Sequence, residues 1–493
     1  MAINASINHF NNSVILRSKI IMQKLNTSLF KRLSVPLLSA VVLVGCGSAE
    51  KKQEGELWLT MPDKSVMFEK QENLLTGQSD NQGNVINIDP SKTYQEMDGF
   101  GYTLTGGSAM HISKMSAEAR EKLLNELYGT GEGSIGVSYI RVSIGASDLD
   151  EKLFSYNDLP KGETDVNMEK FDLGYDKQYL IPVLQQILKI NPEIKILGSP
   201  WSPPVWMKDN GDTRGGSLKP EFYPAYAKYF VKYVQEMKAN GITIDAITVQ
   251  NEPLHPGNNP SLLMPAEAQK VFVRDHLGPA FEKNGIKTKI IVYDHNADRP
   301  DYPITILDDP EAAKYIDGSA FHLYGGTVDA ISKVHDAHPD KNLYFTEQWV
   351  GAPGDFAKEL TWHTENLIIG APRNWCKTVL EWNVAADENQ QPHTDRGGCD
   401  RCLGAVTITG DKITREPAYY IIAHASKFVL PGSVRIESNL AEGLPNVAYK
   451  TPEGKIVVIL QNTSQEEKIV NINAGENKTA VKLKAGAVAT LVL

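Results

Sequence analysis

Two glutamates each follow an apolar run and have the chemistry of an acid and a nucleophile. Glu252 lies in "AITVQNEP" (246–253) and Glu347 in "LYFTEQWVG" (343–351). A strand end holds a side chain rigidly, and Pro253 helps to end the first strand. Glycoside hydrolysis needs such a pair, because one carboxyl protonates the leaving oxygen while the other attacks the anomeric carbon. One Asn-Glu-Pro could equally be a helix N-cap or a surface carboxylate, so the second glutamate favours the catalytic interpretation.

Residues suited to hold a sugar occur at or near other apolar strand ends. Arginine, aspartate and asparagine can hydrogen-bond hydroxyl groups, and tryptophan offers a flat apolar surface to a sugar ring. The candidates are Arg141, Asp148, Trp201, Asn251, His322, Tyr324 and Trp382.

The elements that must position these residues alternate along the middle of the chain. Strands are predicted at 99–104, 138–144, 195–200, 246–251, 289–294, 318–324, 343–348 and 378–383, with amphipathic helices between them. In the helix predicted at 221–240, a core stripe contains Tyr226, Phe230, Tyr233 and Met237. This α/β alternation predicts a (β/α)8 TIM barrel over 98–428. Such barrels carry active sites at the C-terminal ends of their strands, so both glutamates should face one bowl.

The two flanks of the barrel have a different pattern. Residues 429–493 contain short alternating strands with Gly and Asn turns, and the tether and strands of 47–97 include "GELWLTM" and "NVINIDP". We therefore expect both flanks to join in a side β-sandwich.

The first 46 residues resemble a lipoprotein signal peptide. Basic residues precede "VPLLSAVVLVG", which is too short for a stable membrane span, and the run ends at Cys46. "LVGC" resembles the bacterial lipobox, whose cysteine is lipidated; a plain signal peptide with an incidental cysteine is the alternative. Met22 is a second candidate start. We expect an exported protein held by this lipid, in the outer membrane or at the cell surface, because Gly47 rather than Asp follows the cysteine.

Composition limits the partners. Lys+Arg number 50 and Asp+Glu 60, so the net charge of −10 disfavours nucleic acid and anionic membranes as partners, apart from the lipid anchor. The eleven histidines form no His-Glu-x-x-His pair, and "GTGEGSIG" precedes a strand rather than a helix. We expect no cofactor, no metal and a monomer.

Three cysteines remain after Cys46. Cys399 and Cys402 in "CDRC" could form a small disulfide, stay free, or contribute to a zinc site that would need further ligands. Cys376 is expected to be a buried free thiol.

The motifs "GSPWSPPVWMK", "VQNEP", "FHLYGG", "FTEQWVG" and "YYIIAHASKFVLPGSVRI" occur in the order of glycoside hydrolase family 30. The resemblance spans about residues 94–493, and the family includes glucosylceramidases and microbial β-1,6-glucanases. It implies a retaining mechanism with Glu252 as acid/base and Glu347 as nucleophile. It also implies that the seven candidates above line the sugar subsite and that the barrel carries a side β-sandwich.

With these roles assigned, the expected charge states of Glu252 and Glu347 follow. Asn251 should bond the sugar 2-hydroxyl, Glu347 should raise the pKa of Glu252, and Arg141 should help to keep Glu347 ionised.

Two departures bear on the substrate. "TLTGGSAMH" lacks the acidic residue typical of the glucosylceramidase branch, and the cysteine-bearing loop after 378–383 is long. Both features look more like the bacterial β-1,6-glucanase branch. The sequence thus favours β-1,6-glucan over glucosylceramide. A xylan- or fucose-directed hydrolase and a non-catalytic glycan-binding lipoprotein remain as alternatives.

Overall fold

The computed structural model describes residues 55–71, 75–76, 84–475 and 477–493. The predicted signal peptide 1–46, with Met22 and Cys46, and the tether up to residue 54 lie outside these residues. In the part that is described, no helix has the length and apolar character needed to cross a membrane.

Eight parallel strands close into a barrel, in the order β10-β11-β13-β5-β6-β7-β8-β9. The strands are β5 (Gly99–Thr103), β6 (Tyr139–Ser143), β7 (Lys195–Ser199), β8 (Ala246–Thr248), β9 (Lys289–Asn296), β10 (Ile316–His322), β11 (Asn342–Glu347) and β13 (Cys376–Asn383). The predicted TIM barrel is therefore confirmed.

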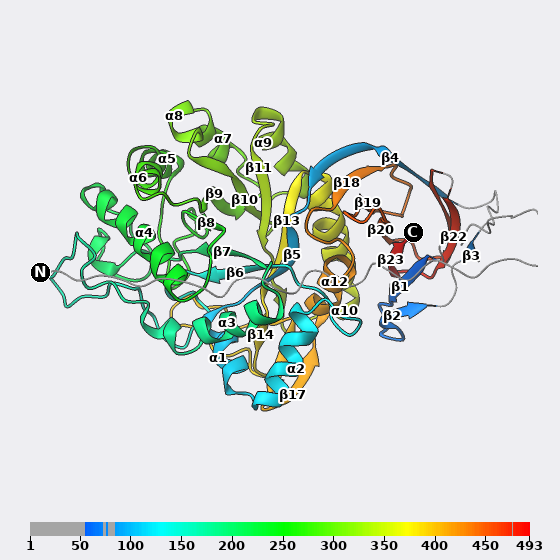
Figure 1. The fold of residues 1–493 in the computed structure, drawn as a ribbon, viewed down its shortest axis with the longest axis horizontal. Helices are drawn as coiled ribbons and strands as arrows, with labels where there is room; N and C mark the ends of the chain where they lie inside the picture. The colour runs from blue at the N-terminus through cyan, green and yellow to red at the C-terminus, as the bar shows by residue number, and fades with distance from the viewer. Residues whose placement is uncertain (1–54, 72–74, 77–83, 476) are drawn as a thin grey trace, which may run out of the picture. The chain divides into compact units, whose positions relative to one another are not determined.

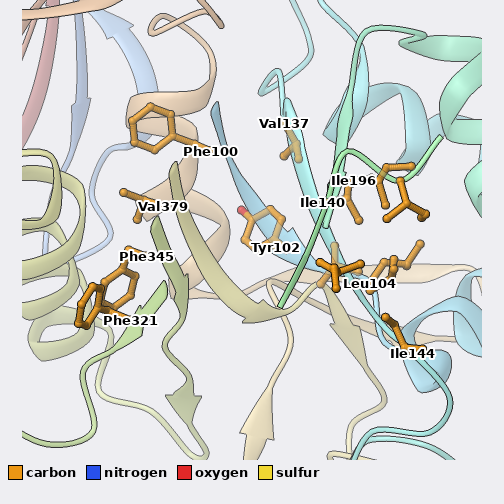
Figure 2. Close-up of a cluster of buried hydrophobic side chains, with 14 of the residues drawn as sticks. Phe100, Tyr102, Leu104, Val137, Ile140, Ile144, Ile196, Phe321, Phe345 and Val379 are labelled. Carbon is orange, nitrogen blue, oxygen red and sulfur yellow. The ribbon is translucent and has the colours of Figure 1, made fainter. Parts of the chain in front are cut away.

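Apolar side chains on both faces of these strands explain why they form a barrel rather than a one-sided sheet. Tyr139, Leu197, Ala246, Ile291, Ala320, Tyr344 and Leu380 form one cluster of buried side chains. A second, larger cluster joins strand residues to the surrounding helices; Figure 2 shows members from several strands, such as Phe100, Ile140 and Phe345. Gly101 allows a close approach of two strands, since a Cβ there would lie 1.9 Å from the carbonyl oxygen of Tyr139.

Helices surround the barrel (Figure 1). They are α1 (Gly106–Lys114), α2 (Ala117–Tyr128), α3 (Leu180–Ile190), α4 (Tyr223–Ala239), α5 (Ala266–Phe272), α6 (Gly278–Lys283), α7 (Asp301–Leu307), α8 (Pro310–Ala313), α9 (Ser332–Ala337), α10 (Phe356–His363), α11 (Ala371–Arg373) and α12 (Pro417–Ser426). The predicted stripe on α4 is completely buried, as an amphipathic helix against a sheet requires.

Both flanks of the barrel meet in one ten-stranded sheet, ordered β2-β1-β23-β20-β19-β18-β4-β21-β22-β3. Its strands are β1 (Glu56–Thr60), β2 (Met67–Gln71), β3 (Leu75–Thr76), β4 (Asn84–Glu96), β18 (Val434–Ser438), β19 (Asn446–Lys450), β20 (Ile456–Gln461), β21 (Lys468–Ala474), β22 (Asn477–Leu483) and β23 (Val488–Val492). Strand β1 pairs with β23, and β4 pairs with β18 and β21, so N- and C-terminal strands lie side by side (Figure 1). The predicted boundaries fall between β4 and β5 and between α12 and β18.

The end of the fourth barrel strand differs from the prediction. Strand β8 stops at Thr248, so Asn251 and Glu252 lie just beyond it, and Glu252 has a φ of 45°. This left-handed backbone is costly for a residue with a side chain, so the surrounding structure must hold it in place.

Small sheets tie together the loops after β11 and β13. Strand β12 (Val350–Gly351) pairs with β15 (Cys402–Leu403), and β14 (Ala385–Ala386), β16 (Val406–Thr409) and β17 (Lys412–Arg415) form a second small sheet. Cys399 and Cys402 are joined in a disulfide, whereas Cys376 is buried and free.

Candidate active site

A cavity of about 400 Å³ contains both glutamates at the C-terminal ends of the barrel strands. We call it the carboxylate cavity. Glu252 and Glu347 are 7% and 6% exposed, so both are almost withdrawn from solvent. Its lining is Asp148, Trp201, Glu252, His255, Asn258, His295, Asn296, Tyr324, Glu347, Trp349, Trp382, Cys399 and Cys402.

Glu347 accepts two strong hydrogen bonds. Arg141 Nη1 lies 2.6 Å from its Oε2, and the Tyr324 hydroxyl donates to its Oε1 at 2.9 Å. Burial raises the pKa of Glu347 and the charge of Glu252 adds to this, while His322 and Arg141 act to lower it. Arg141 thus favours the ionised form, as predicted, although the net pKa lies above its ordinary value.

Glu252 faces a histidine. His322 Nδ1 lies 3.2 Å from Glu252 Oε1, and His322 Nε2 lies 3.0 Å from Asp294 Oδ1. Burial would lower the pKa of His322, but Glu347, Asp294 and Glu252 raise it to about 9. Burial raises the pKa of Glu252, yet the hydrogen bond and the positive charge of His322 bring it below its ordinary value.

The predicted rise in the pKa of Glu252 is therefore wrong for the free enzyme. No local feature of the sequence places an imidazolium against this carboxylate. The raised pKa of His322 and the lowered pKa of Glu252 together favour the proton on His322 at neutral pH.

Residues 97–429 match the glycosyl hydrolase family 30 TIM-barrel domain, and residues 432–491 match the family 30 beta sandwich domain. The chain belongs to glycosyl hydrolase family 30. It is accordingly a glycosidase.

Curated relatives and solved structures agree with this assignment. The endo-1,6-β-D-glucanase of Neurospora crassa is 34% identical over 411 residues, which cover 79% of this chain and 83% of the relative. The lysosomal acid glucosylceramidase of Mus musculus is 29% identical over 416 residues, covering 78% of each. The solved structure of the endo-β1,6-glucanase BT3312 has a TM-score of 0.83 and 35% identity, over 89% of this chain and 98% of that one.

The seven predicted subsite residues of this family 30 glycosidase occupy two layers. Asp148, Trp201, Tyr324 and Trp382 line the carboxylate cavity. Arg141 and His322 are completely buried and contact the acidic groups, and Asn251, which is 4% exposed, accepts from Arg141 Nη2 through its Oδ1 at 2.6 Å. That these three residues belong to the sugar subsite stays a prediction.

The two inner tryptophans form the closed end of the cavity. The rings of Trp201 and Trp382 lie 5.3 Å apart, and the Arg141 guanidinium lies over both. Beside them, burial together with Glu347 and Glu252 raises the pKa of Asp148 to about 8. Asp148 therefore carries a proton at neutral pH and can donate to a sugar hydroxyl.

Sequence reasoning missed Asp294, the centre of the buried network. Its Oδ2 pairs with Arg141 Nη2 at 2.9 Å and accepts from Ser199 and Thr248. Burial alone would raise the pKa of Asp294, but Arg141 and His322 hold it far below its usual range. The signal was present in "VYDHN" at the end of the predicted strand 289–294, where the strand-end rule also applies.

Other wall residues were also missed. His255, Asn258, His295, Asn296 and Trp349 line the cavity. Trp349 lies within one of the quoted motifs. His255 and Asn258 lie in a loop, where no periodic pattern predicts which way a side chain points.

The segment after β5 lacks the acidic residue that is typical of the glucosylceramidase branch, and Asp150 from another loop lies close to this position. A Cβ at Gly106 would lie 1.7 Å from Asp150 Oδ1, so this first residue of α1 leaves room for an acidic residue from the loop after β6. Burial raises the pKa of Asp150 to about 7.

Among the described residues, Glu252, His322 and Glu347 have ligand atoms that all lie within 4.8 Å of one another, a spacing that could hold a metal ion. These side chains already pair with Arg141, Tyr324 and Asp294. Hydrolysis by two carboxyl groups requires no metal.

Proposed function

We propose that this glycosidase hydrolyses β-1,6-glucan by a retaining double displacement, with Glu347 as nucleophile and Glu252 as acid/base. The observation that carries the proposal is the short gap between the carboxyl groups: one oxygen of each lies within 4.8 Å. Retaining enzymes place these groups about 5–5.5 Å apart, whereas inverting enzymes need about 6.5–9.5 Å to fit a water.

In the first step, Glu347 attacks the anomeric carbon and the bond to the leaving oxygen breaks. Arg141 and Tyr324 hold Glu347 in position. Glu252 first receives a proton from His322 Nδ1 across their 3.2 Å contact and then passes it to the leaving oxygen, so that Glu252 ends this step as a carboxylate. Substrate binding removes water from around Glu252, which favours its neutral form and draws the proton from His322.

In the second step, Glu252 accepts a proton from water, and the water attacks the glycosyl-Glu347 ester. The ester is uncharged, so the like charge beside Glu252 is absent during this step. Asn251 uses its Oδ1 to accept from Arg141, which leaves its Nδ2 group to donate to the sugar 2-hydroxyl.

The relatives support β-1,6-glucan as the substrate. Endo-1,6-β-glucanases are more similar to this chain than the lysosomal glucosylceramidase, by 34% against 29% identity over comparable lengths. The disulfide-bearing loop after β13 reaches the cavity wall through Cys399 and Cys402. The length of this loop and its cysteines are the features that resemble the bacterial β-1,6-glucanase branch.

Products from a substrate panel test the proposal. Pustulan and gentiobiose should be cleaved faster than laminarin or glucosylceramide, and proton NMR should show the β-anomer first. Glu347→Gln should lose activity while the protein remains folded. An α-anomer as first product would refute retention, and preferential release of glucose from glucosylceramide would refute the substrate.

We also propose that Cys46 carries a lipid that holds the exported protein at a membrane surface. The sequence "LVGC" after an apolar run supports this anchor. Cys46→Ala should move the protein from the membrane fraction to the soluble fraction. Unchanged membrane association would contradict the proposal.

A further inference from the structure

A second cavity, of about 550 Å³, adjoins the carboxylate cavity. We call it the Trp362 pocket. Tyr324 and Trp349 line both cavities, so one wall is common to them. The complete lining is Leu323, Tyr324, Gln348, Trp349, Gly351, Glu359, Trp362, His363 and Arg401.

The pocket presents aromatic surface to solvent. Trp362 is 39% exposed and Tyr324 40%, although few large apolar side chains of the described residues reach such values. Flat rings around a hollow beside a glycosidase site provide stacking surfaces for sugar rings.

Trp362 is held in a fixed position. It lies on α10 next to His363, and the two rings are 5.1 Å apart. His363 Nδ1 lies 2.6 Å from Glu381 Oε1 on β13, and its Nε2 lies 3.1 Å from Glu359 Oε2. These contacts tie the last turn of α10 to the barrel wall.

Polar groups in the pocket have bonding capacity left for a ligand. Gln348 is 7% exposed, and its Oε1 has no hydrogen-bond partner among the described residues. Buried polar atoms in folded proteins usually have a partner, so this oxygen is available to accept a hydrogen bond from a ligand in the pocket. Arg401 uses Nε and Nη2 to donate to the Ala352 carbonyl, which leaves Nη1 to donate elsewhere.

The position of the pocket indicates which sugar it takes. Trp201 and Trp382, 1% and 4% exposed, close the inner end of the carboxylate cavity, and Cys399–Cys402 lines the same wall. The exposed Tyr324 and the half-buried Trp349 border both cavities, so a chain bound in the carboxylate cavity can continue past them into the Trp362 pocket. A sugar in the Trp362 pocket would therefore be the neighbour of the sugar held in the carboxylate cavity.

We propose that the Trp362 pocket binds the glucosyl residue on the leaving-group side of the cleaved bond, with Trp362 as its stacking platform and Gln348 as a hydrogen-bond partner. This inference rests on the proposed function. A β-1,6 linkage has one more rotatable bond than a linkage to a ring hydroxyl. That freedom lets the next ring turn sideways into a pocket behind Tyr324.

The test compares substrates that do and do not fill the pocket. Trp362→Ala should lower kcat/KM for gentiotetraose about tenfold, because an aromatic platform contributes on the order of one tenfold step in affinity. Hydrolysis of β-glucosyl fluoride and β-gentiobiosyl fluoride, whose leaving group is one atom, should change by less than about twofold. Trp362→Phe should recover part of the loss on gentiotetraose.

The control is Ile469→Ala, at a residue that is 44% exposed on β21 of the sandwich and should leave every rate unchanged. Unchanged hydrolysis of gentiotetraose by Trp362→Ala would overturn the proposal, and so would an equal loss on all three substrates. A loss confined to gentiotetraose and β-gentiobiosyl fluoride would place the sugar on the other side of the bond and also overturn it. A wild-type enzyme that cleaves glucosyl fluoride but not gentiotetraose would instead refute the proposed β-1,6-glucan substrate.

Discussion

Charged side chains of the active site are buried together, and each depends on a partner. Arg141 is completely buried between Asp294 and Glu347, at 2.9 Å and 2.6 Å. Removing one member of such a set leaves an unpaired buried charge, which costs about 3–5 kcal/mol. The most informative substitutions are therefore those that change a proton rather than remove a whole ion pair.

Glu252→Ala should separate the acid/base role from that of the nucleophile. A gentio-oligosaccharide needs its leaving oxygen protonated, so its hydrolysis should fall about 10²–10⁴-fold. A dinitrophenyl glucoside leaves unaided, so the glycosyl-enzyme should accumulate as a burst with a lowered KM. Azide needs no base and should restore turnover, giving a β-glucosyl azide. If azide gives no such product and both substrates lose equally, Glu252 has another role.

The pH profile should reveal the proton shared by His322 and Glu252. Their pair must hold one proton for the first step, and the pKa of His322 is raised to about 9 against burial. The proton is thus present below about pH 9, and kcat/KM should fall as pH rises through this value. In His322→Gln the proton must reside on Glu252, a weaker base, so the alkaline limb should move to lower pH.

Asp148→Asn is the control for this profile, because burial and the nearby glutamates raise the pKa of Asp148 to about 8. A limb that moves in Asp148→Asn and not in His322→Gln would assign the alkaline limb to Asp148.

At the scale of elements, the loops after β11 and β13 together form parts of the walls of the carboxylate cavity and the Trp362 pocket. The loop after β11 pairs with the loop after β13 through β12 and β15, and Ala352 N donates to Arg401 O at 2.7 Å. Arg401 lies between the two bonded cysteines, one of which belongs to β15. The disulfide therefore fixes one wall of the carboxylate cavity and one corner of the Trp362 pocket.

Replacing both cysteines, Cys399→Ser with Cys402→Ser, should loosen this junction. The closed loop is short, with a sequence separation of 3, so the free energy of unfolding should fall by about 2 kcal/mol or less. Hydrolysis of gentiotetraose should fall more than that of β-glucosyl fluoride, because Arg401 borders the outer pocket. Denaturant unfolding and the two rates measure this, and wild-type enzyme treated with dithiothreitol should match the variant. If the untreated wild type and the double variant have the same free energy of unfolding, the disulfide does not stabilise the fold.

At the scale of the whole molecule, the barrel and sandwich are joined by buried polar contacts. His424 on α12 lies with Nδ1 2.9 Å from Thr490 Oγ1 and Nε2 2.8 Å from Thr60 Oγ1. These threonines belong to β23 and β1, which come from opposite ends of the sequence. One neutral imidazole therefore connects the last barrel helix to both strands.

Acid should weaken this connection. Burial lowers the pKa of His424 to about 3, whereas in the unfolded chain it is about 6.5. Between these values the unfolded state binds a proton that the folded state does not, so stability is lost as pH falls below about 6.5, by up to about 1.4 kcal/mol per pH unit. His424→Gln should show a shallower fall in the free energy of unfolding between pH 6 and pH 4, measured with urea. An unchanged slope would mean that other groups govern the acid sensitivity.

The sequence by itself determined the barrel, the joining of both flanks in a sandwich and the placement of Glu347 at the end of one barrel strand and of Glu252 just beyond another. Hydrophobic alternation and strand-end position are local signals, and each strand end carries its chemistry in a few adjacent residues. The same local signals identified Trp201, Trp382 and Asp148 as candidates for binding a sugar.

Only the tertiary structure decided which groups meet. Asp294 and His322 control the protons of the pair through contacts made across several strands, and Trp362 becomes a surface for a sugar only because α10 lies beside Tyr324. The state of Cys399 and Cys402 likewise depended on their approach in space. Distance and burial set these pKa values and contacts, and both arise from closure of the barrel, which no local stretch of sequence encodes.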